Sequence, residues 1–198
     1  MSAPLVLGDI ADLRAYERER EAFRAEVIAL KRLRRVAIGP LVTVVLENRT
    51  TVRFQIQEMA RAEKMVTDEQ IEGELAVYNP LIPAPGELSM TMFIELTSET
   101  ELREWLPRLV GVERSVLVRV GDGDDEHVEG ALLDPDHERQ LTRDNVTASV
   151  HYVRVVLPEA LRAGLVEHRV RLEIDHPEYR HATELGRETK ASIAADWA

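Results

Sequence analysis

Hydrophobic side chains at helical spacing mark the first element of the chain. The residues that carry this pattern are Leu13, Tyr16, Phe23, Val27 and Leu30. Such spacing is typical of a helix with one apolar face, and Asp9 is a suitable N-cap residue before it. We therefore predict a long N-terminal helix over residues 9–35, whose apolar face is compatible with pairing in a homodimer.

The central region, residues 36–96, alternates between strand and helix patterns. Residues 36–46 are rich in β-branched side chains and predict one strand, bent near Gly39 and Pro40. A central pair of helices is expected over residues 50–65 and 67–78. Three prolines exclude helix from residues 79–86. Apolar residues then alternate over 88–96, which predicts a strand with one buried face.

The second half of the chain contains more strands than helices. The expected elements are a short helix over 98–109 closed by Gly111, strands over 112–120, 127–133, 146–157 and 169–175, a brief helix over 159–163, and a C-terminal helix over 182–197. Strands outnumber the helices that could connect them in parallel. The chain is therefore predicted to be one α+β domain, residues 1–198, with an antiparallel or mixed sheet.

Composition and charge exclude several classes of protein. The chain has 198 residues, with 25 Lys and Arg against 36 Asp and Glu, a formal net charge of −11, and no cysteine. Without cysteine there is no disulfide, thiolate metal site or catalytic thiol. The acidic balance argues against a nucleic-acid partner. No apolar run approaches the roughly 18 residues of a membrane helix, and no secretory signal pattern begins the chain, so we expect a cytoplasmic protein without a membrane partner.

The negative charge is concentrated in an acidic segment, residues 95–140. Positions 95–139 hold thirteen acidic and five basic residues, which accounts for −8 of the net charge of −11. This segment predicts a solvated surface or a docking face for a basic partner.

Two histidines lie in phase with apolar strand positions. His151 has the same parity as Val153 and Val155, and His176 has the same parity as Leu172 and Ile174. Because alternate side chains of a strand share a face, both histidines are expected to point inward.

Four carboxylates lie on or beside apolar faces of the central region. Glu63 extends the apolar face of the first central helix, Glu58 flanks that face, Glu74 lies within the apolar face of the second helix, and Glu47 follows the preceding strand. Two histidines with several carboxylates form the donor set of non-haem iron or manganese sites, and sometimes of zinc sites. The metal-ligand hypothesis therefore names His151, His176, Glu58, Glu63, Glu47 and Glu74.

Two other readings of the same residues remain open. The inward acids could instead pair with Arg49, Arg53 or Arg61, because a buried carboxylate needs a base or a hydrogen-bond donor. A small-molecule pocket beside the proline-rich loop, residues 79–86, is a third alternative.

Several motifs of the chain resemble one bacterial family. They are Glu47-Asn48-Arg49-Thr50-Thr51-Val52, Gln55-Ile56-Gln57-Glu58-Met59, Tyr78-Asn79-Pro80-Leu81-Ile82-Pro83, Thr91-Met92-Phe93-Ile94-Glu95, His151-Tyr152-Val153-Arg154 and Asp175-His176-Pro177-Glu178-Tyr179. Together they resemble the family catalogued as domain of unknown function 3501, over nearly the whole chain. The acidic hairpin around residues 122–138 lies outside these motifs.

The resemblance implies a genomic setting rather than an activity. Genes of this family are similar in context, because they often lie beside rubrerythrin and an iron–sulfur oxidoreductase. This implies a soluble accessory protein of iron or peroxide redox metabolism, with iron as its metal and a rubrerythrin-like or iron–sulfur redox protein as its partner. The alternative is a non-catalytic interaction or assembly module without a metal, whose buried acids pair with arginines.

Overall fold

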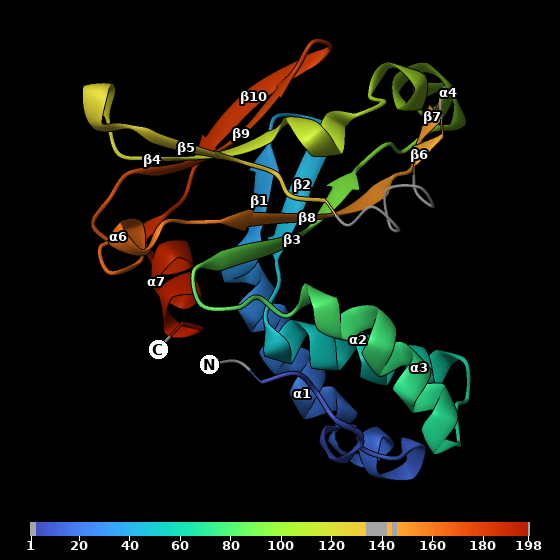
Figure 1. Cartoon of the computed structure of the whole chain (residues 1–198). Coiled ribbons are helices and arrows are strands. Elements are labelled where there is room, and N and C mark those ends of the chain that lie inside the picture. Colours follow the sequence, from blue (N-terminus) through green and yellow to red (C-terminus); the bar gives the residue numbers. More distant parts are fainter. Residues whose placement is uncertain (1–2, 134–141, 144–145, 198) are drawn as a thin grey trace.

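Two antiparallel sheets are stacked on each other, and a layer of helices covers one of them (Figure 1). The computed structural model describes residues 3–133, 142–143 and 146–197. The first sheet has the order β1 (Arg35–Ile38), β2 (Val42–Leu46), β3 (Glu87–Ile94), β8 (Val150–Val156). The second has the order β10 (Tyr179–Glu184), β9 (Val170–His176), β4 (Val116–Val120), β5 (His127–Gly130). A short ladder joins β6 (Thr142–Arg143) to β7 (Val146–Thr147).

The helical layer lies under the first sheet, on the side away from the second (Figure 1). It consists of α1 (Leu13–Arg34), α2 (Arg49–Ala62) and α3 (Asp68–Tyr78), with the short helices η1 (Leu7–Asp9) and η2 (Asn79–Leu81). The other helices are α4 (Glu99–Arg108), η3 (Val112–Ser115), η4 (Gly123–Asp125), α6 (Glu159–Arg162) and α7 (Arg187–Ala195). The predicted α+β class, with a long N-terminal helix, a central helix pair and a C-terminal helix, is confirmed.

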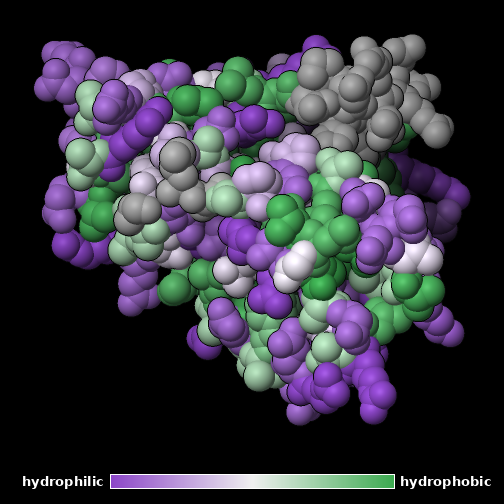
Figure 2. Space-filling model, turned by 60° about the horizontal axis from the view of Figure 1, so that its bottom comes forward, coloured by the Kyte–Doolittle hydropathy of each residue, from purple (hydrophilic) through white to green (hydrophobic). Residues whose placement is uncertain are grey.

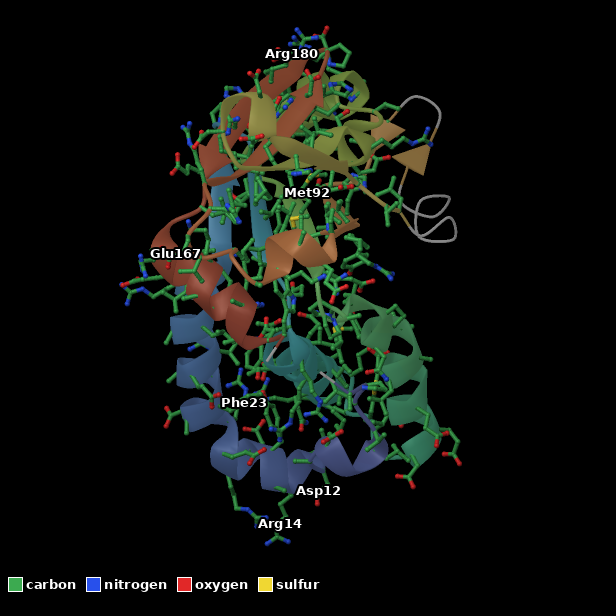
Figure 3. All side chains as sticks on the ribbon, turned by 60° about the vertical axis from the view of Figure 1, so that its left-hand side comes forward. Asp12, Arg14, Phe23, Met92, Glu167 and Arg180 are labelled. Carbon is green, nitrogen blue, oxygen red and sulfur yellow. The ribbon has the colours of Figure 1, made fainter. Side chains whose placement is uncertain are left out.

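The main hydrophobic core lies between the two sheets. Met90 and Met92 of β3 and Val153 of β8 point into it and pack with Val118 and Leu172 of the second sheet. Figure 3 labels Met92 between the strand layers. Because side chains of a strand alternate, the intervening residues of β3 and β8 face the helices instead.

One difference from the prediction is that residues 36–46 form a hairpin instead of a single bent strand. β1 and β2 pair with each other, from Ile38 opposite Val42 to Arg35 opposite Val45. Gly39 in the turn has φ +72°, a conformation that side chains other than glycine rarely adopt. The Tyr179 hydroxyl of β10 donates to the Ile38 carbonyl at 2.6 Å and so ties this turn to the second sheet.

The prediction of a helix over residues 182–197 is wrong at its start. Residues up to Glu184 belong to β10, which pairs with β9 along its whole length, and the helix α7 begins only at Arg187. At the other end of the chain, α1 begins at Leu13 with Asp12 as its cap, since the Asp12 side chain accepts a hydrogen bond from the Ala15 amide. Residues 134–140 of the predicted acidic segment lie outside the described residues.

The surface of the helical layer is mainly hydrophilic. Figure 2 shows this face, with hydrophobic residues gathered near its centre and hydrophilic residues around them. Within the described part of the chain, no helix combines the length and apolar character needed to cross a membrane.

Candidate functional site

A cavity of about 260 Å³ lies between the first sheet and the helical layer. Its polar lining consists of Lys31, Glu47, Gln55, Tyr78, Thr91 and Tyr152. Its apolar lining consists of Val52, Leu81, Phe93 and Val150. We call this space the Glu47 cavity, after the carboxylate that is most deeply placed among its charged groups.

The floor of the Glu47 cavity comes from two paired strands. Thr91 and Phe93 alternate along β3 with the core methionines, so they face the helices. On β8, Tyr152 lies directly opposite Thr91, and Val150 lies directly opposite Phe93. Because side chains two positions apart on a strand share a face, this pairing brings four lining side chains together on one face of the sheet.

The walls come from three helices that end or begin at the cavity. Lys31 belongs to the last turn of α1, and Gln55 is an exposed residue of α2. Tyr78 is the last residue of α3, where Pro80 in the next turn cannot continue the helix. The predicted proline-rich loop thus places Tyr78 and Leu81 at the cavity.

Glu47 lies between the end of β2 and the N-cap of α2. Its backbone amide donates to the Ser89 carbonyl at 2.7 Å, and its side chain is buried with 9 % residue exposure. The carboxylate accepts hydrogen bonds from the hydroxyls of Thr51 (2.5 Å) and Thr91 (2.7 Å). Both donors are neutral. Among the described residues, no Lys, Arg or His nitrogen lies within 4.0 Å of this carboxylate.

Tyr152 adds a phenol to the same cavity. Burial raises the pKa of Tyr152, and the nearby Tyr78 and Glu47 raise it further. Each of these effects opposes formation of a phenolate. The Tyr152 hydroxyl therefore keeps its proton at neutral pH and is able to donate a hydrogen bond.

The second predicted ligand, Glu58, is engaged by an arginine and a tyrosine. Arg20 Nε and Nη2 donate to its two carboxylate oxygens, each at 2.8 Å, and the Tyr16 hydroxyl donates to Oε1 at 2.7 Å. The Arg20 hydrogen bonds are the largest cause that lowers the pKa of Glu58, to about 2. Burial and the hydrogen bond to Glu58 raise the pKa of Tyr16.

Glu63 and Glu74 lie near enough to each other to interact electrostatically, and neither lines the Glu47 cavity. Glu63 is the exposed C-cap residue of α2, and Glu74 is half-buried on α3. Burial raises the pKa of Glu74, and the charge of Glu63 raises it further. The structure thus brings two of the six predicted ligands together, as a pair of like charges.

Both predicted histidines point inward, as expected, but into the space between the sheets. His151 Nε2 lies 2.9 Å from the Ala148 carbonyl, and its Nδ1 lies 4.0 Å from the Glu113 carboxylate. His176 Nε2 lies 3.1 Å from the Val110 carbonyl. His151 shares the core-facing side of β8, whereas Glu47 lies on the helix-facing side of the sheet.

The six predicted ligands therefore do not form one cluster. Over residues 3–133, 142–143 and 146–197, no group of three or more His, Asp or Glu side chains is arranged to hold a metal ion. The arginines proposed as alternative partners bind other acids: Arg49 pairs with Asp9, Arg53 with Glu19, and Arg61 with Glu17.

A second hollow, of about 340 Å³, lies between the start of α1 and the turn from α2 to α3. Its charged lining residues, Asp12, Arg14 and Asp68, are exposed. A desolvated charge aimed into a cavity is the stronger sign of a binding site, because it must be compensated. The Glu47 cavity is therefore the candidate site, although it is the smaller space.

Sequence reasoning found Glu47 and missed most of its neighbours. The residues it missed are Lys31, Gln55, Tyr78, Thr91 and Tyr152. The available signal was the alternation of side chains along the strands predicted over 88–96 and 146–157. In these strands Thr91 and Tyr152 occupy positions between the apolar core residues. The alternation predicts one buried face and does not reveal that the helical layer covers the other face.

Comparisons with known proteins agree with this fold. A crystal structure of a novel protein of unknown function from Burkholderia pseudomallei K96243 has 36 % sequence identity and a TM-score of 0.88, and the match covers 99 % of this chain and 100 % of that one. A search of curated proteins finds no match. The family model described as protein of unknown function, DUF3501, matches residues 4–197, and the chain therefore belongs to this family.

Proposed function

We propose that the protein binds a small organic molecule in the Glu47 cavity. The observation that carries this proposal is a carboxylate with 9 % exposure that lines a cavity and has only neutral hydroxyl partners among the described residues. A buried charge of this kind is costly unless a donor or a cation compensates it.

The size and lining of the cavity support a small ligand. Its volume of about 260 Å³ lies just below the roughly 300–1,000 Å³ of sites for drug-sized molecules. Aromatic side chains supply apolar contact area, while a few polar groups converge on the same space and would fix the orientation of a ligand. The recognition groups are one ammonium, one carboxylate, two phenols, one hydroxyl and one carboxamide.

A screen with a plugged variant tests the proposal. Wild-type protein is screened by ligand-observed NMR against a library of amino acids, amines, carboxylic acids, sugars and nucleosides. Gln55→Trp serves as the blocked protein, because Gln55 is exposed and a large ring there fills the entrance without disturbing the buried packing. Arg32→Trp, which adds the same ring at an exposed position that does not line the cavity, is the matched control.

The expected result is at least one compound that binds wild type and Arg32→Trp but not Gln55→Trp. Binding that is equal in all three proteins would place the compound elsewhere and contradict the proposal. A library without any binder would contradict it as well.

The role in iron or peroxide redox metabolism, with a rubrerythrin-like or iron–sulfur partner, stays a prediction that rests on the resemblance. Metal analysis of protein purified without chelators, before and after anaerobic loading with Fe(II), tests it directly. Stoichiometric metal that disappears in His151→Ala or Glu47→Gln would support the predicted ligands. Absence of metal from wild type under both conditions would refute them and leave the binding proposal untouched.

A further inference from the structure

The Glu47 cavity contains charges of both signs that do not pair with each other. The ammonium of Lys31 lines the same space as the carboxylate of Glu47. In the described part of the chain, no carboxylate lies within ion-pair distance of Lys31, and Glu47 is held by Thr51 and Thr91. The two charges belong to different elements, the last turn of α1 and the end of β2.

This arrangement determines which charge type a ligand should carry. A simple cation would compensate Glu47 but bring a second positive charge next to Lys31. A simple anion would compensate Lys31 but approach the buried Glu47 carboxylate. Each mismatch costs free energy, because like charges are brought together in a partly desolvated space.

Building on the proposed function, we infer that the ligand is a small zwitterion of the amino-acid class, whose ammonium faces Glu47 and whose carboxylate faces Lys31. Both ends then find an opposite charge, and neither meets a like one. Tyr78, Phe93 and Tyr152 supply aromatic surface for the side chain. Aromatic rings also favour a nearby ammonium through their electron-rich faces.

The phenol of Tyr152 fits the same orientation. Because it stays protonated, it is able to donate a hydrogen bond to a carboxylate or another acceptor of the ligand. Gln55 at the entrance offers both a donor and an acceptor and does not select one charge type.

Matched probes that differ only in charge test the inference. The first series is L-leucine, isoamylamine and isocaproate, which share one side chain, and the second is L-phenylalanine, phenethylamine and hydrocinnamate. L-alanine, ethylamine and propionate form a third series for a smaller side chain. Affinities are measured by isothermal titration calorimetry on dialysed wild-type protein. In at least one series the zwitterion is expected to bind about tenfold or more tightly than either partner probe.

Two variants assign the preference to the two charges. Glu47→Gln should reduce the affinity for the amino acid to that for the matching acid, and Lys31→Met should reduce it to that for the matching amine. Arg32→Met, an exposed neighbour of Lys31 that does not line the cavity, is the control and should leave the preference unchanged. Circular dichroism checks that each variant is folded. If Glu47→Gln does not fold, Lys31→Met still tests the preference, because Lys31 is half-exposed.

Three outcomes would overturn the inference: an amine or acid that matches the zwitterion in every series, a preference that survives both variants, or no binding in any series. A non-zwitterionic library compound that binds wild type but not Gln55→Trp would overturn only the ligand class. In that case the binding function itself would stand.

Discussion

Replacing Glu58 with glutamine is expected to destabilise the protein in a pH-dependent way. The substitution keeps the shape of the side chain but removes the charge that Arg20 and Tyr16 bind. The folded-state pKa of Glu58 is about 2, against 4.5 for the free side chain. This difference of about 2.5 units corresponds to about 3.4 kcal/mol at neutral pH, before screening by water is considered.

Screening reduces this figure, because the side chains of Arg20 and Glu58 are 27 % and 28 % exposed. We therefore expect Glu58→Gln to lower the free energy of unfolding by about 1–2 kcal/mol at neutral pH. Because the folded-state pKa is depressed, the contribution is fully present above pH 4.5. It is lost as the pH falls from there towards 2, the folded-state pKa.

Urea unfolding of wild type and Glu58→Gln, followed by circular dichroism at a series of pH values from neutral to acidic, measures both effects. Glu17→Gln is the control, since its pair with Arg61 is 52 % and 40 % exposed. This control should change stability by less than about 0.5 kcal/mol. A difference between wild type and Glu58→Gln that is absent at neutral pH, or that does not shrink in acid, would refute the reasoning.

Three further predictions concern positions outside the cavity. Arg34→Met should lower the free energy of unfolding by about 2–4 kcal/mol in urea titrations, because it removes the buried donor to Asp196 Oδ2 and to the carbonyls of Leu46 and Ser192; an unchanged midpoint would contradict this. Gly39→Ala should cost about 1–3 kcal/mol, measured in the same way, because φ is +72° and the new Cβ would lie 2.4 Å from His181 Cγ; a neutral effect would show that the turn relaxes. His151→Gln should reduce the loss of stability on acidification below pH 6.5, because burial lowers the pKa of His151 and the unfolded chain then takes up the proton first; parallel pH profiles of variant and wild type would exclude this.

The sequence predicted elements well where the signal was local. The hydroxyl of Ser98 caps α4, and that of Thr67 caps α3, within one or two residues of the expected starts. Pro80 ended a helix where expected. Capping groups and proline act through neighbouring backbone atoms, so a single sequence contains the information.

The sequence failed where distant pairing decided the outcome. Residues 182–184 become a strand because β9 is available as a partner, which no local propensity reveals. The same applies to Glu58, whose partner Arg20 lies 38 positions away on α1. A carboxylate on an apolar helix face could be identified, but the choice between a metal and an arginine depended on which helix packs against that face.

Arg34, the last residue of α1, connects the N-terminal half of the chain to the C-terminal helix through hydrogen bonds. Its guanidinium donates to Leu46 and Glu47 carbonyls beside the cavity and also to Ser192 and Asp196, 158 and 162 positions further along. While the ribosome is still translating residues before α7, this buried cation has only part of its acceptors. The hydrogen-bond network that holds the backbone of Leu46 and Glu47 is therefore complete only after α7 has been translated and has docked.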